Sequence, residues 1–220
     1  MNAQLLTVAA MVSGALFGVF SDRLAARWPA HYDEDGLPST GPMRGIDWRT
    51  FVMAAASAAS FAALVARWTE PRDLVVLGVY FAALIVLAAT DLDQKLLPDL
   101  ITFPLMGAAL VLLIIGWAPL LAGKDLGYIS GIVAGIGGPI FLIVTDRALG
   151  GALGFGDVKL AVGLGLMSGI SRLIGGFLIA SVASSVVLLM LIAARRLGMR
   201  SAIPFGPILI AAGIIAALLP

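Results

Sequence analysis

Long apolar runs take up most of this chain and limit how it can fold. Eight runs stand out, at residues 3–20, 51–68, 73–90, 99–117, 127–145, 158–170, 173–194 and 203–219. A run of about 18 residues or more can cross a bilayer as a helix, because roughly 20 helical residues span the hydrocarbon core. A helix also satisfies its own backbone hydrogen bonds in lipid. We therefore predict an all-α polytopic membrane protein with about eight transmembrane helices, of which 158–170 is short.

The composition leaves little room for a soluble domain. Hydrophobic residues make up 60% of the 220 residues and charged residues only 12%, whereas soluble domains carry about 25% charged residues. The one long polar connection, at about 21–50, mixes proline, glycine and acidic residues, which is typical of a loop. We predict a single transmembrane domain over residues 1–220, in contact with the lipid bilayer and without a nucleic-acid partner.

The basic residues predict the orientation of the helices. With the N-terminus outside, alternating connections place ten of them on one side: Arg23, Arg27, Arg44, Arg49, Lys95, Arg147, Lys159, Arg195, Arg196 and Arg200. The other side holds only Arg67, Arg72, Lys124 and Arg172. Basic connections favour the cytoplasm. The side with ten basic residues is therefore predicted to be cytoplasmic, and so are the helix ends that carry Asp91 and Asp157.

Two aspartates lie at the edges of apolar runs. Asp91 follows the apolar residues 84–90, and Asp157 directly precedes the run 158–170. An ionisable group at membrane depth is costly, so a functional site is the first hypothesis for each. Because both helix ends are predicted on one side of the bilayer, the two carboxylates can meet once the helices pack.

The rest of the composition excludes several kinds of active site. The chain has no cysteine, which excludes a thiol nucleophile and a cysteine-ligated zinc site. Its one histidine, His31, lies in the polar connection, where a surface role is the usual one. Neither a serine–histidine–aspartate triad nor a two-histidine zinc site is convincingly assembled from this sequence. Carboxylates remain for acid–base chemistry. A carboxylate pair needs no metal and no cofactor, although Asp91, Asp93 and Asp157 could also converge on a hard cation such as Mg²⁺.

Two aspartates suffice for peptide hydrolysis when they share one proton. Like charges a few ångströms apart cannot both ionise, so such a pair titrates in two separate steps. The ionised aspartate takes a proton from water, its protonated partner polarises the scissile carbonyl, and the roles then reverse. Asp91 and Asp157 fit this mechanism if tertiary packing brings them together.

The acidic neighbours of Asp91 have structural interpretations. Asp93 is two residues further on, about 200° around a helix, so the two side chains cannot both face one partner. Asp99 follows Pro98, a sequence typical of a first helical turn. An acid at that position complements the helix dipole. Of the three acids Asp91, Asp93 and Asp99, we therefore assign a catalytic role only to Asp91.

The neighbours of Asp157 are interpreted differently. Gly154 and Gly156 allow unusual backbone angles and the close approach of a second chain. An extended substrate beside a catalytic aspartate would need such a loop. Lys159 has two interpretations, because it either anchors its helix at the membrane interface or helps to orient the Asp157 loop.

Two other classes of protein are alternatives to a hydrolase. The main alternative is a transporter or channel in which Asp91 and Asp157 relay protons or cations. A non-enzymatic membrane scaffold is the third possibility. Cleavage of a substrate in detergent, without any ion gradient, would separate the hydrolase from both.

Three motifs in order resemble the prepilin peptidases, or type IV leader peptidases, of the Gly-x-Gly-Asp membrane aspartyl proteases. Asp91 is followed after five residues by Leu97-Pro98-Asp99, residues 154–160 read Gly-Phe-Gly-Asp-Val-Lys-Leu, and residues 204–207 read Pro-Phe-Gly-Pro. Presenilins and signal peptide peptidases share Gly-x-Gly-Asp but match the other motifs less well. The resemblance implies that Asp91 and Asp157 are catalytic, supported by Gly154, Gly156, Lys159, Pro98, Pro204, Gly206 and Pro207.

The resemblance also implies a substrate and a location. Substrates of this family are prepilin or pseudopilin precursors with a short basic leader, a glycine at the cleavage point and a following apolar helix. The expected location is the inner membrane of a prokaryote, with the active site facing the cytoplasm. Many bacterial members carry a four-cysteine zinc module in the first loop and also methylate the product. Residues 28–50 contain no cysteine, so we do not expect N-methyltransferase activity here.

Overall fold

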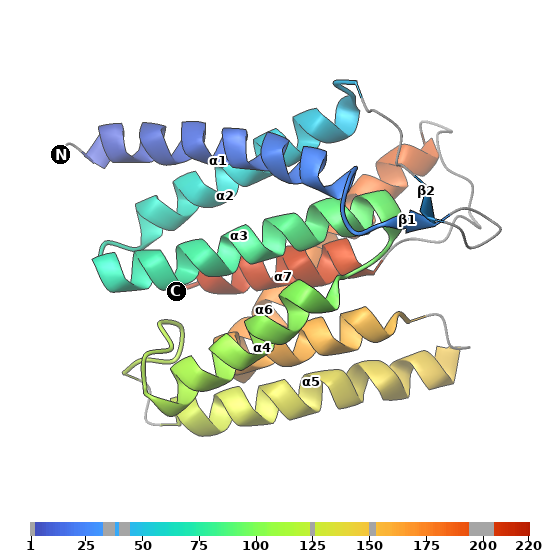
Figure 1. The fold of residues 1–220 in the computed structure, drawn as a ribbon. Coiled ribbons are helices and arrows are strands. Elements are labelled where there is room, and N and C mark those ends of the chain that lie inside the picture. The colour runs from blue at the N-terminus through green and yellow to red at the C-terminus, as the bar shows by residue number, and fades with distance from the viewer. Residues whose placement is uncertain (1–2, 33–37, 40–44, 124–125, 150–152, 194–204) are drawn as a thin grey trace. The chain divides into compact units, whose positions relative to one another are not determined.

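The computed structural model confirms an all-helical membrane protein. It describes residues 3–32, 38–39, 45–123, 126–149, 153–193 and 205–220. The helices in these residues are α1 (Ala3–Ala25), α2 (Trp48–Arg67), α3 (Pro71–Gln94), α4 (Asp99–Ile114), α5 (Gly127–Leu149), α6 (Phe155–Ala193) and α7 (Gly206–Leu218), with a short antiparallel pair of strands β1 (His31–Tyr32) and β2 (Pro38–Ser39) (Figure 1). Five helices, α1, α2, α3, α5 and α6, are long and apolar enough to cross a membrane. The other two, α4 and α7, are shorter apolar helices.

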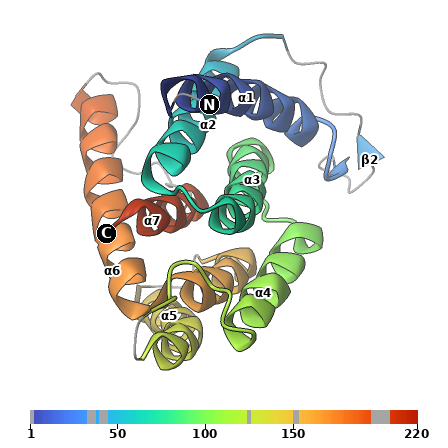
Figure 2. The ribbon, with the colours of Figure 1, turned by 90° about the vertical axis from the view of Figure 1, so that its left-hand side faces the viewer.

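Helix α6 is two helical segments joined at a break. Gly169 lies at the break with φ 68° and ψ 178°, a conformation that is not helical. Figure 2 shows the two parts of α6 running in different directions. The amide of Ile170, just past the break, donates to the hydroxyl of Ser130 on α5 (2.9 Å). With α6 counted as two segments, the described residues contain the eight predicted helical segments, and the segment before Gly169 is the predicted short one.

The chain divides into two compact units, Met1–Ile101 and Thr102–Pro220, called the N-terminal unit and the C-terminal unit below. Each is described by itself. In the N-terminal unit, α1 and α2 pack closely through two glycines of α1. A Cβ at Gly18 would overlap the carbonyl of Met53, and one at Gly14 would lie 2.8 Å from the carbonyl oxygen of Ser57. Small residues four apart are a common contact between membrane helices, because they let two backbones approach.

Helix α3 contributes to the core of the N-terminal unit. Its Ile85 and Ala89 are buried together with Ala25 of α1 and Met53 of α2. Proline at its first turn suits a helix start, because its missing amide has no intrahelical partner there. The helix ends at Lys95, which takes the left-handed conformation with φ 53°. The polar residues next to that end, which include Asp91, therefore lie at a defined helix terminus.

The C-terminal unit is held together by close contacts of α6 with its neighbours. A Cβ at Gly165 would overlap the α5 backbone at Ala134, and one at Gly176 would overlap the carbonyl of Ala212 on α7. Arg172 also joins α6 to α7, because its Nη1 donates to the carbonyl oxygens of Leu219 (2.8 Å) and Ala216 (3.4 Å). These carbonyls belong to the last turn of α7, which has no intrahelical donors for them.

Candidate functional site

Asp91 lies in the last turn of α3. Its side chain is almost completely buried, and the preceding Thr90 is fully buried and donates its hydroxyl to the carbonyl of Leu87 (3.0 Å). The backbone carbonyl of Asp91 accepts the amide of Lys95 (2.9 Å), the residue that ends the helix. The carboxylate therefore lies between an apolar helix and the exposed residues that follow it, as the sequence predicts.

Asp157 lies in the first turn of α6 and caps its own helix. Its amide donates to the carbonyl of Gly154 (3.0 Å), and the amide of Gly154 hydrogen-bonds to its carboxylate. The second of these contacts is one half of a capping box, in which an acid three residues into a helix satisfies the amide at its start. The side chain is buried, and its Oδ1 has no hydrogen-bond partner among the described residues. One carboxylate oxygen is thus committed to the helix start, and the other is available for chemistry.

Gly154 and Gly156 do not have the unusual backbone angles that the sequence suggests. Among the described residues, the glycines with positive φ are Gly116, Gly123 and Gly169. Gly154 is exposed, and a Cβ added to it would meet only the Oδ2 of Asp157, at 3.4 Å. The lack of a side chain beside the Asp157 carboxylate therefore matters more than the backbone conformation.

Lys159 contacts two aromatic rings in the C-terminal unit. Its Nζ lies 4.7 Å from the ring centroid of Phe103 on α4 and 4.7 Å from that of Phe155 on α6. A cation over an aromatic face is attracted by the ring's quadrupole. Lys159 is two residues from Asp157, so it projects from a different side of α6. The contacts favour a role in holding α4 against the start of α6.

The remaining predicted site residues that the structure describes lie at or just before helix starts. Pro98 is buried, and its carbonyl accepts the amide of Ile101 (3.0 Å) in the first turn of α4. Asp99 is the first residue of α4, as predicted. Gly206 and Pro207 form the first turn of α7, where Gly206 is buried. Pro204 lies outside the described residues.

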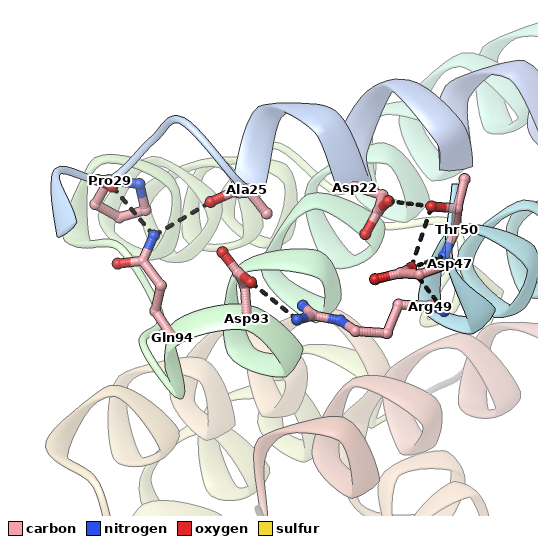
Figure 3. A network of polar contacts seen from close by, with 8 residues as sticks. All are labelled: Asp22, Ala25, Pro29, Asp47, Arg49, Thr50, Asp93 and Gln94. Carbon is pink, nitrogen blue, oxygen red and sulfur yellow. Dashed lines mark hydrogen bonds and ion pairs between the residues drawn. The ribbon is translucent and has the colours of Figure 1, made fainter. Parts of the chain in front are cut away.

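A polar network near Asp91 was not predicted from the sequence (Figure 3). Arg49 at the start of α2 forms an ion pair with Asp93 in the last turn of α3, with 2.8 Å between Nη1 and Oδ1. The side chains are only 10% and 4% exposed, so the pair is buried. Gln94 donates its side-chain amide to the carbonyls of Ala25 (3.2 Å) and Pro29 (3.1 Å). The ion pair therefore attaches the last turn of α3 to α2, and the hydrogen bonds of Gln94 attach it to the end of α1.

The same network holds a buried acid of α1. Asp22 is 1% exposed, and its Oδ2 accepts the hydroxyl of Thr50 (2.6 Å). Asp47 precedes α2 and accepts the amides of Arg49 (3.0 Å) and Thr50 (3.1 Å), as an N-cap does. Figure 3 shows these side chains between the ends of α1, α2 and α3. An acid just beyond an apolar run, as Asp22 is after residue 20, is a sequence signal that could have indicated this network.

The two predicted catalytic residues belong to different units, Asp91 to the N-terminal and Asp157 to the C-terminal one. Their pairing therefore stays a prediction. Among the described residues, no three acidic or histidine side chains are grouped so as to hold a metal ion.

Comparisons with known proteins agree with the motifs. The model of the type IV leader peptidase family matches residues 78–190, a range that contains both aspartates. A prepilin leader peptidase/N-methyltransferase of Pseudomonas putida is 36% identical over 140 residues, which cover 62% of this chain and 46% of the relative. A protein of the same name from Dickeya chrysanthemi is 33% identical over 175 residues, which cover 76% of this chain and 59% of the relative.

A third relative of that name, from Bacillus subtilis, is 29% identical over 163 residues, which cover 73% of this chain and 62% of the relative. The chain thus spans about half the length of the curated relatives it matches. No solved structure shows a significant match to it.

Proposed function

Because the chain belongs to the type IV leader peptidase family, we propose that it is a membrane-embedded aspartyl endopeptidase. Its substrates are type IV prepilin or pseudopilin precursors, from which it removes the short basic leader on the cytoplasmic side of the inner membrane. The observation that carries the proposal is that Asp91 and Asp157 are both buried at helix ends, within the range that the family model matches.

In the proposed mechanism, Asp91 and Asp157 share one proton. The ionised member takes a proton from a water molecule as the water attacks the scissile carbonyl, and the protonated member polarises that carbonyl. The tetrahedral intermediate then collapses, and the leaving amine receives a proton from the pair. No side chain of the protein forms a covalent bond, and no metal takes part.

The surroundings of Asp157 support the binding of an extended chain. The Oδ1 of Asp157 is not used by the helix cap, and Gly154 presents no side chain beside the carboxylate. A substrate backbone can therefore approach this carboxylate closely. The burial of Asp91 and of Asp157 also keeps bulk water away from each carboxylate, which strengthens electrostatic interactions in the transition state.

The substrate's parts fit the proposed topology. A basic leader lies on the cytoplasmic side, where most of the basic residues of this chain also lie by the positive-inside rule. The apolar segment after the cleavage point lies in the bilayer beside the helices. The relatives are named for a second activity, N-methyl transfer. We propose that this chain lacks it, because residues 28–50 contain no cysteine for the zinc module.

Cleavage of a prepilin-type precursor by the purified chain in detergent tests the proposal. Asp91→Asn and Asp157→Asn should each reduce cleavage by several orders of magnitude, because neither variant retains a shared proton. Asp99→Asn is the matched control, since Asp99 is exposed in the first turn of α4, and it should keep most of the activity. Near-normal cleavage by either of the first two variants would refute the assignment.

The same assay separates the peptidase from a transporter. Detergent micelles sustain no ion gradient, so a proton or cation relay has no function to show there. An intact precursor after long incubation with the folded wild-type chain would contradict the peptidase and leave the relay as the better explanation.

A further inference from the structure

A buried ion pair lies next to Asp91 in the N-terminal unit. Asp93 is two residues after Asp91 in the last turn of α3, and its Oδ1 lies 2.8 Å from the Nη1 of Arg49. Arg49 is the second residue of α2, so the pair joins two helices. Both side chains are at least nine-tenths buried. In such surroundings the loss of one charge leaves the other buried and uncompensated, so the pair acts as a unit.

The Arg49 side chain makes no other hydrogen bond among the described residues. Its Nε and Nη2 are buried and make no hydrogen bond there. Its backbone is held in place, because its amide donates to the side chain of Asp47, which caps α2. The backbone of Arg49 is therefore held at the start of α2, and its guanidinium pairs with Asp93.

A second contact holds the same turn of α3. The side-chain amide of Gln94 donates to the carbonyls of Ala25 (3.2 Å) and Pro29 (3.1 Å), at and just beyond the end of α1. The turn from Asp91 to Gln94 is thus attached to α2 through Asp93 and to α1 through Gln94 (Figure 3). A last helical turn frays easily when nothing holds it. These two contacts oppose fraying.

We propose that Arg49 is a positioning residue for the peptidase reaction: by its ion pair with Asp93 it fixes the last turn of α3 and so orients the carboxylate of Asp91. The inference rests on the proposed function. A displacement of about 1 Å in a catalytic group lowers a rate by roughly 100-fold. Loss of one of the two contacts that hold this turn is therefore enough to slow the reaction, even when the fold is retained.

Steady-state kinetics of the full chain in detergent, with a prepilin-type precursor, test the proposal. Arg49→Gln and Asp93→Asn should each lower kcat by about tenfold or more and change KM by less than about threefold, because they disturb catalysis and not substrate binding. The double variant should be no slower than the slower single variant, since the two residues act as one unit. Arg49→Lys keeps the positive charge on a different head group, so its kcat should lie between wild type and Arg49→Gln.

Arg27→Gln is the matched control. Arg27 lies just beyond the end of α1, and its side chain is exposed. Its kcat should stay within about twofold of wild type, because exposed charges contribute little. All rates are expressed per folded protein after size-exclusion chromatography. Wild-type kcat for Arg49→Gln or Asp93→Asn on that basis would overturn the inference.

Hydrogen exchange gives a readout that does not depend on cleavage. The amide of Lys95 donates to the carbonyl of Asp91 and reports whether the last turn of α3 is closed. This amide should exchange at least about tenfold faster in Arg49→Gln than in wild type, and Arg27→Gln should not change it. Unchanged exchange would overturn the inference.

The proposed function and this inference fail in different ways. An active Asp91→Asn variant would overturn both, because no catalytic carboxylate would remain to be positioned. An inactive Asp91→Asn variant together with fully active Arg49→Gln and Asp93→Asn variants would overturn only the positioning role. If the wild type cleaves no precursor, the exchange measurement alone decides whether Arg49 fixes this turn.

Discussion

At the scale of single residues, Asp157 caps its own helix and is also one of the two proposed catalytic residues. An acid at a helix start is usually explained by capping, and the Asp157 carboxylate does bond to the amide of Gly154. Only one of its oxygens is needed for that bond, and Oδ1 has no hydrogen-bond partner among the described residues. The capping role therefore does not argue against catalysis, because it holds the carboxylate in one orientation.

Substitutions at Asp157 should separate capping from catalysis. Asp157→Asn keeps an oxygen that can accept the Gly154 amide, so the melting temperature in detergent should stay near wild type while cleavage is lost. Asp157→Ala removes both functions, and loss of a capping side chain costs about 1 kcal/mol. Its melting temperature should fall below that of Asp157→Asn. Equal melting temperatures for the two variants would show that the cap does not stabilise α6.

At the scale of secondary-structure elements, the break in α6 depends on one glycine. Gly169 has φ 68° and ψ 178°, a region that residues with a Cβ rarely adopt. A Cβ there would also lie 2.7 Å from both the Cδ2 of Leu121 and the Oγ of Ser130. The break sets the direction of the second part of α6, which carries Arg172 and the contact with α7.

Gly169→Ala should destabilise the protein. The strained backbone alone costs about 1–3 kcal/mol, and the crowding at Leu121 and Ser130 adds to it. The control is Gly137→Ala in α5, where a Cβ would meet nothing within 4 Å. That variant should be neutral or more stable, because alanine favours a helix. Thermal unfolding in detergent compares the two, and equal melting temperatures would contradict this account of the break.

At the scale of the whole molecule, the helices could be predicted because each depends on its own residues. An apolar run of sufficient length predicts a span regardless of its neighbours, and even the short segment before Gly169 was found in this way. The end of α1 was less well predicted. The charged pair Asp22 and Arg23 indicated a loop, but α1 continues to Ala25, and Asp22 is buried against Thr50.

The candidate site was predictable only where its motifs are local. Asp91 and Asp157 were found from short patterns, and each lies at a helix end as expected. The ion pair of Arg49 with Asp93 links residues 44 positions apart. Nothing in the local pattern of either residue indicates the other, since such pairs form only when helices pack. From the sequence alone, Arg49 is therefore only one of the basic residues of the predicted cytoplasmic side, and Asp93 is given no specific partner.

The orientation of the helices is a prediction for the whole molecule. In the variants Lys95→Cys and Arg147→Cys, the new thiol should be labelled by a membrane-impermeant reagent from the cytoplasmic side only. In Arg72→Cys it should be labelled only from the other side. The chain has no cysteine of its own, so the wild type gives no background. Opposite accessibility of positions 95 and 147 would place the two aspartates on different sides of the membrane and refute the peptidase.

The glycine contact between α1 and α2 has a consequence for biosynthesis. A chain is made from its N-terminus, so these two helices enter the membrane before α3 does. Gly14 and Gly18 let them associate through backbone contacts, without waiting for a partner from later in the chain. We therefore expect Arg49 and the carbonyls of Ala25 and Pro29 to be in place when α3 arrives. The paired α1 and α2 would then be the surface on which the end of α3 docks.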